Sequence, residues 1–168
     1  SWLGFRLRCH RAAFAQTDVT DEASVVAAMM TAREAMGRIT CAVNCAGIAT
    51  GAKTLGKDGP HSLAEFQRTI DINLVGSFNA ARLAAAELVI CTPSDDGLRG
   101  VNISTTSIVA LAGLKGQSAN GVSKRGIVGM GLRMARGRGR SSKRVKANRP
   151  GVHLTPIVLG LTRRGQTR

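Results

Sequence analysis

Three residues of types that serve proton transfer lie close together in the sequence: Ser107, Asn120 and Lys124, separated by thirteen and four positions. A serine hydroxyl can hydrogen-bond a substrate oxygen, and a lysine ammonium lowers the pKa of a neighbouring acid. A tyrosine between them would complete a set for general acid–base catalysis. The middle residue is instead an amide, and the chain contains no tyrosine. The spacing therefore predicts a proton-transfer site whose acid is absent.

Short apolar segments and longer amphipathic segments alternate along the chain that must position these residues. We expect helices over residues 22–36, 62–90 and 118–136, and strands over residues 40–46, 101–106 and 145–148. Ser62 and Glu65 have the spacing of a capping box at the start of the second helix. Alternation of this kind is typical of a doubly wound parallel sheet, which binds ligands beyond the carboxyl ends of its strands. The predicted fold class is α/β, a partial Rossmann-like sheet flanked by helices.

Five short sequence motifs occur along the chain. They are Asp18-Val19-Thr20, Asn44-Cys45-Ala46-Gly47, Asp71-Ile72-Asn73-Leu74-Val75-Gly76, the stretch from Ser107 to Lys124, and Pro150-Gly151 followed by Thr155-Pro156. In this order and spacing they resemble the short-chain dehydrogenase/reductase family over residues 14–161. The wording of residues 42–48, 66–68 and 126–130 is most similar to the type-2 3-hydroxyacyl-CoA dehydrogenases.

The resemblance implies a role for each residue of the proton-transfer segment. Ser107 would hydrogen-bond the substrate carbonyl or hydroxyl, and Lys124 would bridge the nicotinamide ribose hydroxyls. Asn73 would help to hold a water chain between Lys124 and solvent, and Asn120 stands at the position of the family's tyrosine. Taken alone, Ser107 is more typical of a strand-end serine that bonds the backbone, and Lys124 of a solvated helix lysine; the flanking motif reverses this preference for Ser107.

The resemblance also implies a set of cofactor-binding residues. Asp18 and Val19 would flank the adenine, and the segment Asn44, Cys45, Ala46 and Gly47 would pass close to its ribose. Pro150, Gly151, Val152, His153 and Thr155 would wrap the nicotinamide carboxamide. The expected cofactor is NAD, with NADP as the alternative, and the expected substrate is an acyl-CoA or another secondary alcohol or ketone. We expect no metal.

The family's first strand and Gly-rich phosphate-binding turn have no counterpart among the 168 residues. The glycines at 126, 129 and 131 follow Lys124 within a predicted helix, where they indicate packing instead of phosphate binding. We therefore expect residues 1–168 to form a single partial dinucleotide-binding domain, truncated at both ends. With Asn120 in place of tyrosine, we expect its dehydrogenase activity to be impaired or absent.

Charge is distributed unevenly along the chain. All ten acidic residues lie at or before Asp96, together with nine basic ones, whereas the remainder carries fifteen basic residues and no acid. A dense basic segment can bind polyanions by counterion release. The alternative function is thus a catalytically dead module whose basic C-terminal half binds RNA or another polyanion. No aromatic residue interleaves the basic run to stack on bases, so nucleic acid is the lesser alternative. A misread gene fragment rich in arginine is a third interpretation.

The four cysteines form no CxxC pair and have no histidine at metal-ligand spacing, so they predict reduced thiols and no zinc site. No uninterrupted apolar run is long enough for a membrane span. We expect a soluble cytoplasmic protein, with a mitochondrial location as the alternative. Family resemblance also implies a homo-oligomer assembled through the helices at 62–90 and 118–136.

Overall fold

The structure is a computed structural model that describes residues 12–137 and 143–151. Val152, His153 and Thr155, three of the expected cofactor-binding residues, lie outside the described residues, as do Arg138 and Arg140 of the basic run. The elements are α1 (Glu22–Met36), β1 (Cys41–Asn44), β2 (Leu55–Gly56), β3 (Gly59–Pro60), α2 (Leu63–Ile70), η2 (Asp71–Val75), α3 (Gly76–Ile90), β4 (Gly100–Thr105), η3 (Ile108–Ala110), α4 (Ser118–Arg136) and β5 (Lys143–Asn148).

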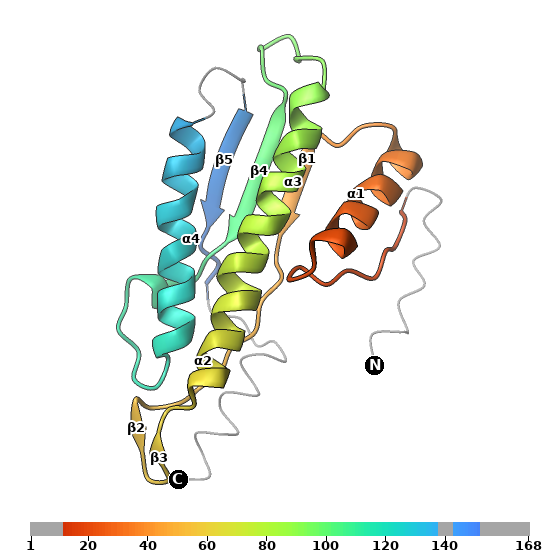
Figure 1. Ribbon diagram of the computed structural model, residues 1–168. Coiled ribbons are helices and arrows are strands. Elements are labelled where there is room, and N and C mark those ends of the chain that lie inside the picture. The colour runs from red at the N-terminus through yellow and green to blue at the C-terminus, as the bar shows by residue number, and fades with distance from the viewer. Residues whose placement is uncertain (1–11, 138–142, 152–168) are drawn as a thin grey trace.

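Three parallel strands form a sheet in the order β1-β4-β5 (Figure 1). Helices α2 and α3 connect β1 to β4, and α4 connects β4 to β5. Parallel neighbours require crossover connections of this kind, because a short hairpin can join only antiparallel strands. The predicted α/β class with a parallel sheet is confirmed.

Helices α3 and α4 pack side by side on one face of the sheet, and α1 packs beside α3 (Figure 1). The small side chains of Ala81 and Ala84 on α3 are buried and allow close contact. The larger Leu88 on α3 and Ile127 on α4 are also buried. Asn102 of β4 faces the same side and donates its amide to the carbonyl of Ala81 at 2.9 Å. The chain builds this core from alanine and aliphatic residues because it has so few aromatic ones.

The opposite face of the sheet bears no helix of the described part of the chain (Figure 1). Side chains alternate between the two faces of a strand. Val43 of β1, on the uncovered face, is consequently 59% exposed although it lies in the middle of its strand. The uncovered face is therefore partly apolar.

The prediction of one continuous helix over residues 62–90 is wrong in the middle of that range. The chain is α-helical over α2 and α3, but η2 between them is a π-helix in which the amide of Gly76 donates to the carbonyl of Asp71. Ser62 caps α2 by accepting from the Glu65 amide at 3.4 Å. The loop before it contains the small antiparallel hairpin of β2 and β3, which is too short to leave an alternating apolar pattern.

Candidate functional site

The end of strand β4 and the second turn of α4 are joined by two hydrogen bonds. The Thr106 hydroxyl donates to the carbonyl of Lys124, and the Lys124 ammonium donates to the carbonyl of Thr105, both at 2.9 Å. Ser107 follows directly and caps η3, because its Oγ accepts from the Val109 amide at 3.5 Å. Ser107 and Lys124 are thus held at the carboxyl end of the central strand, as expected from sequence.

The environment of Lys124 changes its acidity. Burial lowers the pKa of its ammonium below the ordinary value, and the nearby Cys45 thiol partly opposes that change. Cys45 itself lies 3.3 Å from the Thr105 hydroxyl. A Cβ added at Gly47 would be 3.5 Å from Lys124 Nζ and 3.2 Å from Asn73 Oδ1, so a side chain there would crowd the point where these two side chains converge.

Asn73 lies within the π-helix and is fully buried. Its side chain accepts from the Ile48 amide at 2.8 Å and donates to the Ile48 carbonyl at 2.9 Å. The same amide donates to the hydroxyl of Ser123 at 3.2 Å. One side chain therefore ties together the loop after β1, the π-helix and α4. The water chain expected at Asn73 stays a prediction; the contacts that the structure gives its side chain are those to the Ile48 backbone and the Ser123 hydroxyl.

We expect Asn73→Ala to lower the free energy of unfolding by about 2–4 kcal/mol, because two backbone groups and a hydroxyl would lose a buried partner. Urea titration followed by circular dichroism measures the loss. The control is Asn148→Ala at an exposed position, which should change stability by less than about 0.5 kcal/mol. Equal effects from both variants would contradict the structural role of Asn73.

Asn120 is buried on the first turn of α4, with 7% of its surface exposed. Its side-chain amide donates to the Gln117 side chain at 2.9 Å, and its backbone carbonyl accepts from the Ser123 hydroxyl at 2.8 Å. The side chain thus bonds within its own helix end. An amide has no acidic proton to transfer, so the expected loss of proton transfer at this position stays a prediction.

Asp18 and Val19 form a turn in front of α1. Asp18 Oδ1 accepts from the amide of Thr20 at 2.9 Å and from its hydroxyl at 2.7 Å. These bonds, the backbone one first, lower the pKa of the Asp18 carboxyl. The Asp18 carboxyl is therefore ionised at neutral pH. The residue is also exposed to solvent.

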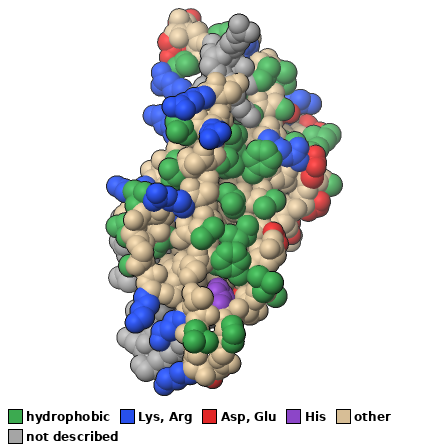
Figure 2. All heavy atoms as spheres, turned by 60° about the vertical axis from the view of Figure 1, so that its left-hand side comes forward, with side chains coloured by type: hydrophobic (Ala, Val, Ile, Leu, Met, Phe, Trp, Pro, Cys, Tyr) green, Lys and Arg blue, Asp and Glu red, His purple; other side chains and the backbone are tan. Residues whose placement is uncertain are grey.

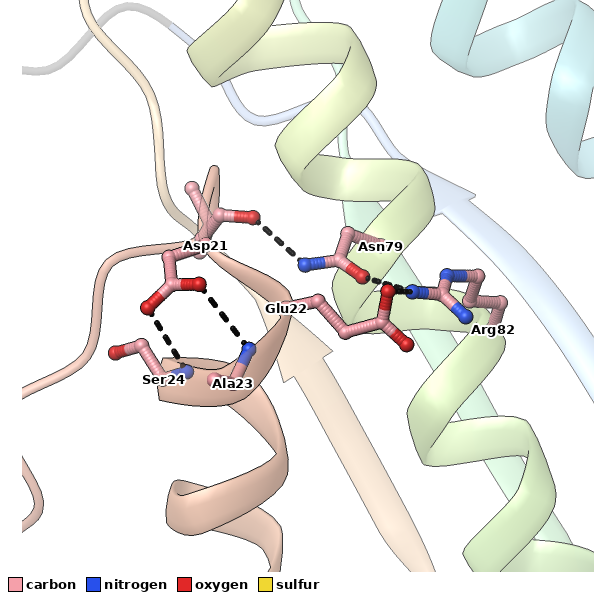
Figure 3. A network of polar contacts seen from close by, with 7 residues as sticks. Asp21, Glu22, Ala23, Ser24, Asn79 and Arg82 are labelled. Atoms are coloured by element: carbon pink, nitrogen blue, oxygen red, sulfur yellow. Dashed lines mark hydrogen bonds and ion pairs between the residues drawn. The ribbon is translucent and has the colours of Figure 1, made fainter.

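A polar network fixes this turn against α3 (Figure 3). Asn79 donates to the carbonyl of Val19 at 3.1 Å, and Arg82 donates to Asn79 at 2.7 Å while it pairs with Glu22 at 2.8 Å. Gly76 permits the approach, because an added Cβ would be 2.6 Å from Val19 Cγ2. The position of the turn is thus set by α3.

The segment after β1 also lies at the carboxyl edge of the sheet. Asn44 Oδ1 accepts from the Ala46 amide at 3.0 Å, whereas Asn44 Nδ2 is buried with no hydrogen-bond partner among the described residues. Pro150 and Gly151 follow β5 at the same edge, where the Asn148 carbonyl accepts from the Thr106 amide at 2.8 Å. The structure brings the described candidates at 44–47, 107, 124 and 150–151 to one edge.

Sequence reasoning missed the residues that support the site, namely Thr106, Ser123, Ile48 and Gln117. Ser123 precedes Lys124 and lies three residues after Asn120, a spacing that places it on the same helical face as Asn120. Ile48 participates through its backbone, so its side chain gave no signal.

Within residues 12–137 and 143–151, no three histidine, cysteine or acidic side chains are grouped so that they could hold a metal ion. Over the same residues, none of the helices combines the length and hydrophobicity that a membrane crossing requires.

Comparison with known proteins agrees with this architecture. A 3-hydroxyacyl-CoA dehydrogenase type-2 from Bos taurus is 48% identical over 151 residues, which are 89% of this chain and 58% of the bovine protein. The Homo sapiens protein of the same name is 45% identical over 150 residues, 88% of this chain and 58% of its own length. The chain thus spans less than two thirds of these relatives.

Solved structures show the same similarity. The crystal structure of 3-hydroxyacyl-CoA dehydrogenase type-2 from Mycobacterium avium superimposes with a TM-score of 0.80 at 36% identity, covering 86% of this chain and 57% of that one. A levodione reductase gives a TM-score of 0.77 at 29% identity, covering 90% and 55%. The family profile described as short chain dehydrogenase matches residues 6–164, and the chain therefore belongs to the short-chain dehydrogenase family.

Proposed function

We propose that this chain is part of a single dinucleotide-binding domain of a short-chain oxidoreductase. Its reaction is hydride transfer between a nicotinamide cofactor, NAD in preference to NADP, and a secondary alcohol or ketone of the 3-hydroxyacyl-CoA class. The observation that carries the proposal is the placement of Ser107 and Lys124 at the carboxyl end of β4, with Asn73 on the adjoining helix. Relatives named for that substrate class support the choice of substrate.

The residues at this edge fit a dinucleotide. The Asn44 amide nitrogen is buried and lacks a partner among the described residues, and the absence of a side chain at Gly47 lets the backbone pass close to Lys124 and Asn73. Lys124 has three N–H donors, so one can bond Thr105 while others reach ribose hydroxyls. Asp18, an exposed carboxylate, would accept from the exocyclic amine of the adenine. The bound cofactor supplies or receives the hydride.

The remaining chemistry belongs to the side chains. Ser107 holds the substrate oxygen, and Lys124 orients the cofactor through its ammonium. Asn120 occupies the position from which a phenol would exchange the proton of the alcohol, and an amide cannot do so. We infer that the site binds and orients substrate but turns over slowly.

The test is reduction of acetoacetyl-CoA by NADH in a chimera in which the segments of the bovine relative that this chain does not span are joined to this chain. We expect the chimera to bind NADH and to oxidise it slowly, with a further loss of binding in Lys124→Ala. Arg133→Ala, at an exposed position in the last turn of α4, serves as the matched cation control and should leave binding unchanged. Failure of the chimera to bind NADH would refute the proposal. Reduction of acetoacetyl-CoA by the 168-residue chain as fast as by the bovine relative would contradict the expected impairment of activity.

We also propose that the chain self-associates through α3 and α4. Hydrophobic side chains gather along the face that includes α4 (Figure 2). Four large apolar side chains are 48–55% exposed, which is high for such residues: Val75 at the end of η2, Phe78 on α3, and Val122 and Leu132 on α4. Burying them between copies would remove this apolar area from water.

A further inference from the structure

A pocket of about 390 Å³ lies at the amino-terminal ends of the three strands, opposite the edge that holds Ser107 and Lys124. Three arginines from different elements line it: Arg38 from the segment between α1 and β1, Arg99 from the residue before β4, and Arg144 from β5. Asp96 is the single acidic residue in its lining. The lining therefore carries a net charge of +2, supplemented by the hydroxyls of Thr40, Thr92 and Ser94.

Arg99 is held in place by the protein. Its guanidinium donates to the carbonyls of Cys91 at 2.6 Å and Val89 at 3.3 Å, at the carboxyl end of α3. These bonds satisfy carbonyl groups that a helix end leaves without partners. The positive charge at the pocket wall is thus preorganised, at no further entropic cost when a ligand arrives.

Arg144 and Asp96 are only loosely paired. Their charged atoms are 3.9 Å apart, and the two side chains are 57% and 61% exposed. Exposed pairs of this length contribute little to stability. Asp96 is instead engaged by the Ser94 hydroxyl, which is the main cause of its lowered pKa. A stronger anion can therefore take the place of this carboxylate in front of Arg144 without a large loss.

We propose that this pocket binds a small phosphate-bearing ligand such as a nucleotide or a diphosphate. Guanidinium groups match phosphate oxygens in geometry and charge, and a volume of this size is in the range of small-molecule sites. The pocket is separate from the proposed catalytic edge, so its ligand is a second molecule and its occupancy does not depend on the dehydrogenase activity.

The test is calorimetric titration of the 168-residue chain with inorganic pyrophosphate at low ionic strength. We expect saturable binding of one pyrophosphate per chain. Arg38→Gln and Arg144→Gln should each weaken it by about two- to fivefold, the effect of an exposed charge contact. Arg68→Gln removes the same charge from α2, at the other end of the molecule, and should leave the affinity nearly unchanged (Figure 1). Arg99 is left intact because it also caps α3.

A gain-of-affinity pair completes the test. Asp96→Asn removes the only carboxylate of the lining and should tighten pyrophosphate binding, whereas Asp95→Asn, at the neighbouring position outside the lining, should not. Circular dichroism confirms that each variant is folded. Equal weakening by Arg68→Gln and Arg144→Gln would overturn the proposal in favour of a diffuse charge effect. A preference for an RNA oligomer over pyrophosphate, lost equally in both variants, would overturn it in favour of the polyanion alternative.

Discussion

The variant Asn120→Tyr is expected to raise the rate of acetoacetyl-CoA reduction by about 10²- to 10⁴-fold in the chimera, the usual contribution of a positioned acid–base group. Residue 120 lies four positions before Lys124 on α4, so the two side chains share a helical face. The ammonium beside a phenol lowers its pKa from about 10 toward the working pH. Burial already lowers the pKa of the Lys124 ammonium. Because a phenol at position 120 and this ammonium would interact, the two groups would titrate as a coupled pair.

The control for this prediction is Asn120→Phe, which introduces the ring without the hydroxyl. Its rate should remain at the level of the unmodified chimera, because volume alone moves no proton. Stopped-flow measurement of NADH oxidation over a range of pH separates proton transfer from binding. A similar rate in the tyrosine and phenylalanine variants would show that residue 120 acts by packing, and our assignment of the missing acid would be wrong.

The second large effect is expected for Gly100→Ala at the start of β4. Gly100 has a φ of +151°, and a Cβ there would be 2.3 Å from the Thr40 carbonyl oxygen and 2.6 Å from Leu88 Cδ2. Neither the backbone of Thr40 nor the fully buried Leu88 can move without disturbing the sheet or α3. We expect a loss of about 3–5 kcal/mol in the free energy of unfolding, from overpacking together with backbone strain.

Two other glycines separate the causes. Gly97 has a φ of +76° with nothing within 4 Å of an added Cβ, so Gly97→Ala should cost only the backbone strain of about 1–2 kcal/mol. Gly113 also has open space and no positive φ, so Gly113→Ala should be neutral or stabilise by up to about 1 kcal/mol. Urea denaturation ranks the three, and an equal loss at Gly97 and Gly100 would show that the clash at Thr40 does not matter.

The sequence predicts much of this fold because its signals are local. Helix α4 has the expected bounds, and α1 is capped by Asp21, which accepts from the amides of Ala23 and Ser24. The strands are found to within about two residues, as is usual for boundaries near hydrogen-bonded ends. The common edge at which the candidate site residues lie follows from the rule that parallel strands end together.

What could not be predicted depends on contacts between distant segments. The π-helix contains Asn73, whose hydrogen-bond partner Ile48 is twenty-five residues away in the sequence. The hydrophobic periodicity of the sequence gives no indication of such a bond. The arginine pocket is assembled from three segments, and two of its arginines, Arg99 and Arg144, lie in the basic part of the chain after Asp96. The unequal charge of the two halves was visible, but the face on which each arginine would lie was not.

The π-helix has a consequence for how this segment tolerates change in length. Each residue of an α-helix advances the side-chain direction by about 100°, and a π-turn holds one residue more than the α-turn that it replaces. Deleting one residue within Asp71–Val75 would therefore leave an α-turn in place of the π-turn and keep α2 and α3 in register, so Gly76 could still face Val19 and Asn79 could still donate to it. The deletion would instead disturb the turn from which Asn73 reaches Ile48 and Ser123. A further inserted residue would have to rotate α3 relative to α2 and so break the contacts of Gly76 and Asn79 with Val19.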